Sequence, residues 1–198
     1  MLHRIRFACG NQTVKILSGI VEADETYVGG LEKNKHADKK LNQGRGTVGK
    51  TPVFGMRDRE GQVVAKVVKN TDTATLQGII KKSVAPGSSI ATDEHAAYRG
   101  LPFTHKVVCH SAKKWVDDWA HTNGIESVWA VLKRMFYGTH HWWSVEKMQF
   151  YIDECTFRQN EGNCKIDTVD RLKALAQGMK GKRLTYSALT KGTYHQNP

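Results

Sequence analysis

Cysteine is scarce in this sequence, and long hydrophobic runs are missing. Four cysteines occur in 198 residues, none in a Cys-x-x-Cys pair, and their spacing matches no zinc module. Scattered thiols of this kind are typical of a reducing compartment. The lack of any run of about 18 apolar residues excludes a membrane-spanning helix, and the basic N-terminus lacks the apolar stretch of a secretory signal. We therefore expect a cytoplasmic protein.

Acidic residues are also few compared with basic ones. The chain has 30 Lys and Arg against 19 Asp and Glu, a formal net charge of +11. A protein this basic usually binds a polyanion, most often nucleic acid, although charge alone leaves ribosomal or membrane-surface contacts open. The hydrophobic content of 39% excludes wholesale disorder, and the length suits one domain of ordinary size.

The first half of the chain has the alternation of β-strands. Residues 20–28 alternate and end at Gly29 and Gly30, which predicts a strand followed by a turn. Residues 52–57 and 62–68 are apolar runs on either side of a turn-forming tetrapeptide, which predicts a β-hairpin. Between them, residues 31–50 are polar and rich in lysine. Such a segment is either a solvated loop or a loop that contacts phosphates.

The second half alternates between strands and helices. Residues 73–85 predict a helix, 89–92 a short strand, 96–99 a helical turn and 105–109 another strand. Three further helices are expected over 123–137, 145–158 and 167–177, whereas residues 1–18 and the tail from 180 have no clear period. Three antiparallel strands followed by α/β units predict an α/β fold, a mixed sheet flanked by helices. This is the element order of an RNase H-like fold with a helical C-terminal extension.

Three acidic residues stand out by their position. Asp24 lies within the first strand, Asp93 at the carboxyl end of strand 89–92, and Glu126 in the first turns of helix 123–137. Sites in open α/β sheets gather at strand ends and adjacent helices. A carboxylate in an apolar strand is costly unless a cation neutralises it, and Mg²⁺ prefers oxygen ligands. Three converging carboxylates would hold two ions about 4 Å apart for phosphodiester chemistry. The alternative is that all three are ordinary surface acids.

Two further acidic residues flank Asp24 in the same strand. Side chains alternate between the two faces of a sheet. Glu22 is therefore expected beside Asp24, whereas Glu25 is expected on the opposite face, outside any site that Asp24 forms.

The long helix is amphipathic. Glu126 and Lys133 share a face with Asn123 and Ala130, which we expect to be exposed. Lys133 is then placed either to contact the DNA backbone or to be a solvated helix lysine. The opposite stripe should pack inward; it comprises Ile125, Trp129, Leu132 and Phe136.

Aromatic and histidine residues gather just after this helix. Trp142 and Trp143 follow His140 and His141 directly. Such tryptophans stack on a flipped or terminal base, or they pack the last helices onto the sheet. The histidines orient water or contact phosphate, or they are structural.

Several segments at this spacing resemble an insertion-sequence transposase of the IS1595 (ISXO2-like) family. The resemblance covers about residues 16–190, nearly the whole chain. It is carried by residues 21–30 (VEADETYVGG), 49–53 (GKTPV), 92–95 (TDEH) with Tyr98, 121–127 (HTNGIES), 132–134 (LKR), 138–141 (GTHH) and 154–160.

The resemblance implies a DDE-type transposase with an RNase H-like catalytic core. Asp24, Asp93 and Glu126 take the three acidic positions, as catalytic residues and as ligands of Mg²⁺, for which Mn²⁺ would substitute. Some family members have asparagine as the third residue, so Asn123 is a candidate neighbouring contributor. The implied chemistry is hydrolysis at the transposon ends, followed by attack of the freed 3′-OH on target DNA.

The resemblance also implies DNA as the partner, both transposon ends and target. A homo-oligomer is expected, in the nucleoid-associated cytoplasm of a bacterium or archaeon. Lys133 resembles the basic residue that follows the third acid in many such enzymes. The expected DNA-binding residues are Lys133, Arg134, Lys50, Arg45, Asn123, His140 and His141.

Such transposases usually begin with a zinc ribbon and a helix-turn-helix, and Cys9 alone cannot form such a zinc site. We expect residues 1–18 to be a remnant of that region, 19–160 to be the catalytic core and 161–198 to be a basic C-terminal extension. Two other functions stay open: a truncated or repurposed DNA-binding relative without catalysis, and a general RNase H-like nuclease or resolvase.

Overall fold

A computed structural model describes residues 1–12, 16–41, 46–108, 119–162 and 164–191. The chain divides into two compact units, one of residues 14–143 and one of residues 1–13 with 144–198. Each unit is described by itself below. None of the described helices is long and apolar enough to cross a membrane.

The larger unit contains one five-stranded sheet. Its strands are β1 (Ile20–Val28), β2 (Thr51–Asp58), β3 (Val63–Val67), β4 (Ser89–Thr92) and β5 (Thr104–Val107), in the spatial order β3-β2-β1-β4-β5. β2 is antiparallel to both β1 and β3, whereas β1 pairs in parallel with β4, and β4 in parallel with β5. This is the order and direction of an RNase H-like sheet, so the predicted fold class is confirmed.

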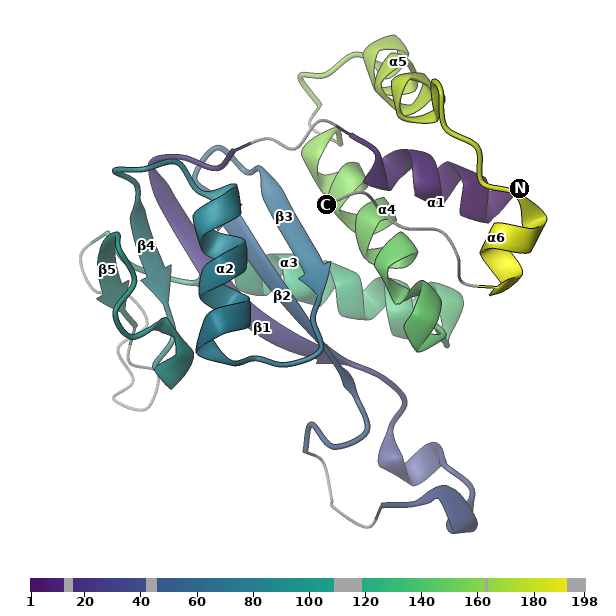
Figure 1. The fold of residues 1–198 in the computed structure, drawn as a ribbon, viewed down its shortest axis with the longest axis horizontal. Coiled ribbons are helices and arrows are strands. Elements are labelled where there is room, and N and C mark those ends of the chain that lie inside the picture. The colour runs from purple at the N-terminus through teal and green to yellow at the C-terminus, as the bar shows by residue number, and fades with distance from the viewer. Residues whose placement is uncertain (13–15, 42–45, 109–118, 163, 192–198) are drawn as a thin grey trace. The chain divides into compact units, whose positions relative to one another are not determined.

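Helices flank this sheet (Figure 1). α2 (Thr73–Ser83) begins at Asp72, whose carboxylate accepts a hydrogen bond from the Thr75 N–H. Its buried Leu76 and Ile80 belong to one core cluster with Val21 and Ala23 of β1. The odd-numbered residues at the start of β1 therefore face α2, and this leaves the even-numbered ones for the opposite face.

α3 (Asn123–Arg134) packs on β1 and β2. Its stripe of Ile125, Trp129 and Leu132 is buried, while Glu126 and Lys133 are exposed, which confirms the predicted faces. The helix runs into a π-helical segment, Met135–His140. His141 then has φ +62°, an uncommon conformation for a residue with a side chain.

Short elements connect these strands and helices. The lysine-rich loop contains two single 3₁₀ turns, Glu32–Asn34 and Ala37–Lys39, and a third, Ala96–Tyr98, follows β4.

The smaller unit is helical. It consists of α1 (Leu2–Gly10), a 3₁₀ turn (Val145–Lys147), α4 (Met148–Asn160), α5 (Thr168–Met179) and α6 (Tyr186–Lys191). The helices predicted over 145–158 and 167–177 are present. α1 and α6 were not predicted, and in α1 the reason is that a charged residue is buried. Arg6 is 6% exposed and donates to Glu154 Oε2 at 2.8 Å, so the helix has no clean apolar stripe.

The two units differ from the boundaries expected at residues 18 and 160. α1 packs on α4 and α5, so the N-terminal residues and the helix over 148–160 belong to one unit. The expected boundary at residue 160 followed the family resemblance, which includes residues 154–160.

Candidate functional site

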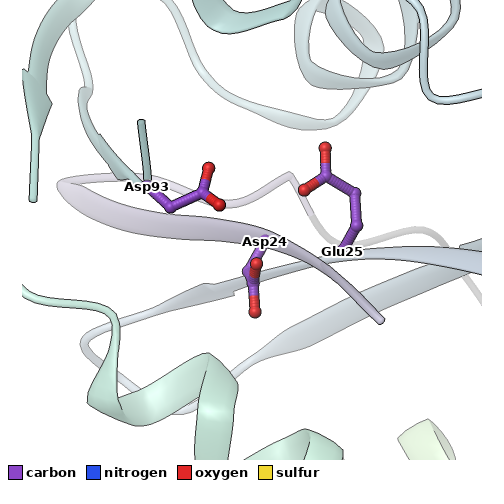
Figure 2. Close-up of side chains that lie close together, drawn as sticks. All are labelled: Asp24, Glu25 and Asp93. Atoms are coloured by element: carbon purple, nitrogen blue, oxygen red, sulfur yellow. The ribbon is translucent and has the colours of Figure 1, made fainter. Parts of the chain in front are cut away.

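Three carboxylates come together at the edge between β1 and β4. Oxygen atoms of Asp24, Glu25 and Asp93 all lie within 4.8 Å of one another. Asp24 and Glu25 are neighbours on β1, and Asp93 directly follows the last residue of β4 (Figure 2). The structure therefore brings together two of the three predicted acidic residues and adds one that the alternation rule excluded.

The exclusion of Glu25 was wrong because the strands separate at this point. β1 pairs with β4 only from Ile20↔Ser89 to Glu22↔Ala91. Beyond Glu22, no strand of the described residues pairs with that edge of β1. Side chains from both faces of the strand can then reach around the edge to the end of β4, whereas inside a paired sheet they stay on opposite sides.

Asp24 lies on the α3 side of the sheet. The indole Nε1 of Trp129 donates a hydrogen bond to Asp24 Oδ2 at 2.9 Å. The residue opposite Asp24 on β2 is Gly55, and a Cβ there would lie 2.7 Å from Cζ2 of Trp129. The absence of a side chain at Gly55 thus makes room for the indole. Burial, together with the nearby charges of Asp93 and Glu25, raises the pKa of Asp24 to about 7.

Glu25 lies on the other face of the strand. Its side chain is only 7% exposed, and its Oε1 has no hydrogen-bond partner among the described residues. His95 Nδ1 is 3.9 Å away from that oxygen. Burial raises the pKa of Glu25, and the Asp93 charge adds to this effect.

Asp93 is half-buried at the start of the loop after β4. Its Oδ1 accepts a hydrogen bond from the backbone N–H of His95 at 3.1 Å. This local turn fixes the carboxylate near the carboxyl end of the strand, as the sequence pattern predicted.

Glu22 has a different role from the one expected. It shares a face with Asp24, but its carboxylate accepts the Ile125 N–H at 2.8 Å, at the N-terminus of α3. It also pairs with Arg59, and its Oε1 lies 3.2 Å from Nδ1 of His121. A Cβ at Gly124 would lie 2.8 Å from Glu22 Oε2. Glu22 is therefore an anchor for α3 and does not belong to the three-carboxylate group.

Glu126 lies outside this cluster. It is exposed in the first turn of α3, and its Oε1 accepts a hydrogen bond from the Thr122 hydroxyl at 2.9 Å. Trp129, which contacts Asp24, is three residues further along the same helix. The predicted third acidic residue is thus close in sequence to the site but does not contribute to the three-carboxylate group.

The residues predicted to bind DNA have varied settings. Lys133 and Arg134 are exposed in the last turn of α3, and Asn123 is exposed at its first residue. Lys50 is half-buried and lies next to Gly29, where a Cβ would be 3.1 Å from its Cγ. Arg45 lies outside the described residues.

The histidine and tryptophan pairs divide between surface and core. His140 is half-buried and His141 is exposed. Trp142 is 68% exposed, whereas Trp143 is 3% exposed and packs edge-on against Phe136, with ring centroids 5.0 Å apart. Packing therefore explains Trp143, and Trp142 is available at the surface.

The donor set at the cluster suits a hard divalent cation. All three groups offer carboxylate oxygen, the ligand type of Mg²⁺, Ca²⁺ and Mn²⁺. Three carboxylates at this separation repel one another, and burial strengthens the repulsion. A buried carboxylate oxygen without a partner, such as Glu25 Oε1, commonly marks the place of an ion or water. The residues present therefore fit a metal centre.

Comparisons with known proteins identify the family of this chain. The family model of the ISXO2-like transposase domain matches residues 16–160, about three quarters of the chain. An uncharacterised transposase-like protein of Haemophilus influenzae is 32% identical over 123 residues, which cover 59% of this chain and 95% of that protein.

Two solved structures have a distant likeness to the chain. The catalytic core domain of BIV integrase has a TM-score of 0.48 and 11% identity, with 83% of this chain and 99% of that one covered. The HTLV-2 integrase catalytic core domain in complex with magnesium has a TM-score of 0.41 and 15% identity, with 76% and 92% covered. These scores are low, and the fold assignment rests on the strand order and directions. The family match over residues 16–160 settles the family: the chain belongs to the ISXO2-like transposases of the IS1595 group.

Proposed function

We propose that this protein cuts and rejoins DNA strands as the catalytic core of an insertion-sequence transposase, with a divalent cation at the Asp24 and Asp93 carboxylates. The observation that carries the proposal is the convergence of these two carboxylates, from strands far apart in the sequence, at the end of an RNase H-like sheet. Family membership supplies the reaction class.

The ligands of the cation would be Asp24 and Asp93, and Mg²⁺ or Mn²⁺ is the fitting ion. Bound cations would supply the chemistry of phosphodiester cleavage, one activating the attacking oxygen and a second, about 4 Å away, stabilising the leaving oxygen. Trp129 would hold Asp24 in one orientation through its indole N–H. We assign Glu126, on the exposed face of α3, as the third acidic residue of the family pattern.

Basic residues around α3 would bind the DNA. Lys133 and Arg134 stand in the last turn of the helix and Asn123 at its start, and the net charge of +11 favours a polyanion. Lys50, Arg45, His140 and His141 complete the proposed DNA-binding set. A homo-oligomer that pairs two DNA ends is part of the same proposal.

A nicking assay on supercoiled plasmid DNA tests this function. We expect the unaltered protein to produce nicked circles with Mg²⁺ or Mn²⁺ and none with a chelator. Asp93→Asn should abolish nicking while retaining the circular dichroism spectrum of the parent. The matched control is Glu60→Gln, at an exposed position in the β2–β3 turn, which should nick like the parent. Equal nicking by Asp93→Asn would overturn the proposal.

A second function, DNA binding without catalysis, is favoured by one observation: Glu126 lies outside the carboxylate cluster. The same samples distinguish the two. Binding that weakens steeply with salt, together with no nicking under any divalent ion, would support the non-catalytic function.

A further inference from the structure

Glu25 stands out among the buried acidic residues of the larger unit. Glu22 has three partners, namely Arg59, His121 and the Ile125 N–H, and Asp24 has the Trp129 indole. Glu25 is less buried than Glu22 as a whole residue, but only 7% of its side chain is exposed, and its Oε1 has no hydrogen-bond partner among the described residues. Burying a carboxylate in this state is costly, so its position needs an explanation that packing does not give.

The hydroxyl of Tyr98 lies beside the Glu25 carboxylate. Tyr98 is 1% exposed, and the Coulomb interaction with Glu25 is among the causes that raise the pKa of its hydroxyl, after burial. That hydroxyl faces the Glu25 carboxylate and favours its charged form by hydrogen bonding, although the two groups do not reach ordinary hydrogen-bond geometry. This contact leaves Glu25 Oε1 without a partner, and a buried oxygen in that state is typical of a site for an ion or a water.

His95 stands near Glu25 without forming a hydrogen bond to it. His95 Nδ1 is 3.9 Å from Oε1, beyond hydrogen-bond distance, and this nitrogen accepts the backbone N–H of Ala97. Among the described residues, Asp24 and Asp93 also lie close by, with oxygens within 4.8 Å of a Glu25 oxygen. Figure 2 shows the Glu25 carboxylate on the same side of the strand as that of Asp93.

We propose that Glu25 is a direct ligand of the divalent cation, alongside Asp24 and Asp93, and that side chains from both faces of β1 coordinate the cation. This inference rests on the proposed metal centre and deepens it. A ligand from each face would hold the ion at the edge of β1 beyond Glu22, where β4 no longer pairs with it. Tyr98 is placed to meet a water of the ion, because Mg²⁺ keeps several waters in protein sites.

Titration of Mn²⁺, followed by the electron paramagnetic resonance of the free ion, tests the assignment without any DNA. Glu25→Gln keeps the shape of the side chain and removes its charge. We expect it to bind Mn²⁺ at least about tenfold more weakly than the parent. The matched control is Glu94→Gln, next to Asp93 but exposed, which should change the affinity less than about twofold, because an exposed charge is screened by water. Parent-like affinity in folded Glu25→Gln would overturn the proposal.

Asp24→Asn separates this failure from that of the metal centre itself. If Asp24→Asn loses Mn²⁺ and Glu25→Gln does not, the centre stands and Glu25 is not a ligand. If both retain parent affinity, the proposed function fails as well.

Crystals of the unaltered chain soaked in Mn²⁺ decide the matter should Glu25→Gln not fold. Anomalous scattering should place the ion about 2.1 Å from a Glu25 oxygen, as expected for a small hard cation bound directly. An ion coordinated by Asp24 and Asp93 but not by Glu25 would contradict the proposal.

Discussion

The indole Nε1 of Trp129 donates a hydrogen bond to Oδ2 of Asp24 at 2.9 Å, across 105 positions of the sequence. This bond joins α3 to β1 at the carboxylate cluster. Trp129 is 4% exposed, so a helix core residue also orients an acidic residue of the site.

Replacing Trp129 by phenylalanine should therefore reduce the stability of the fold by more than the smaller ring alone would. The variant removes both ring volume and the hydrogen-bond donor to the Asp24 carboxyl group, and we expect the free energy of unfolding to fall by about 2–4 kcal/mol. Urea denaturation measures the loss. Trp142→Phe is the matched control, since Trp142 is 68% exposed, and it should change stability by less than about 0.5 kcal/mol. Equal free energies of unfolding for the two variants would show that the hydrogen bond to Asp24 does not stabilise the fold.

The raised pKa of Asp24 gives a pH-dependent stability. The folded state retains this proton up to about pH 7, whereas the ordinary value is 3.8, near which the unfolded chain releases it. The folded protein therefore loses stability as the pH rises from about 4 to 7, by up to about 4 kcal/mol for this group.

Asp24→Asn isolates that contribution. Without divalent cations, we expect the variant to be more stable than the parent at pH 8 and to have parent stability near pH 4, since the parent carboxyl is protonated there. Denaturation across this pH range is the measurement. A stability difference that does not change with pH would contradict the assignment of the raised pKa to Asp24.

The anchor of α3 at Glu22 gives a prediction for Glu22→Ala. The change leaves the Ile125 N–H and part of the Arg59 guanidinium without an acceptor. A loss of about 2–4 kcal/mol in unfolding free energy is expected, and nicking should fall as well because α3 carries Glu126. Glu60→Ala, in the exposed turn, is the control and should be near neutral. A loss no greater than that of the control would remove Glu22 from its role as an anchor.

Gly55→Ala probes the fit between β2 and α3. Its added Cβ would overlap the Trp129 ring, and overpacking of this kind costs about 1–3 kcal/mol. Gly78→Ala makes the same change in α2, where a Cβ would meet nothing within 4 Å. That control should gain about 0.5–1 kcal/mol from helix propensity. Thermal melting of both variants tests the contrast, and a stable Gly55→Ala would contradict the tight contact.

The sheet and α3 could be predicted from the sequence because their signals are local. Alternation marks β1, and the stripe of Ile125, Trp129 and Leu132 marks the buried face of α3. The meeting of Asp24 and Asp93 also follows from a general property of α/β sheets, that functional residues gather at strand ends.

The features that could not be predicted depend on contacts between residues far apart in the sequence. Glu25 joins Asp24 only because β1 loses its β4 partner after Glu22, and no periodicity shows that point. The anchoring role of Glu22 depends on a backbone N–H 103 positions away. α1 was not predicted because Arg6 is buried in an ion pair with Glu154, a residue of α4 that lies 148 positions away in the sequence.

The central claim, that Asp24 and Asp93 hold a divalent cation, is tested most directly by the shift in melting temperature on adding MnCl₂. At a hundred times the dissociation constant, binding stabilises the folded state by about 2.7 kcal/mol, which is a rise of about 5–10 °C for a chain of this length. We predict such a rise for the parent protein and almost none for Asp93→Asn. The same rise in both proteins would contradict the account.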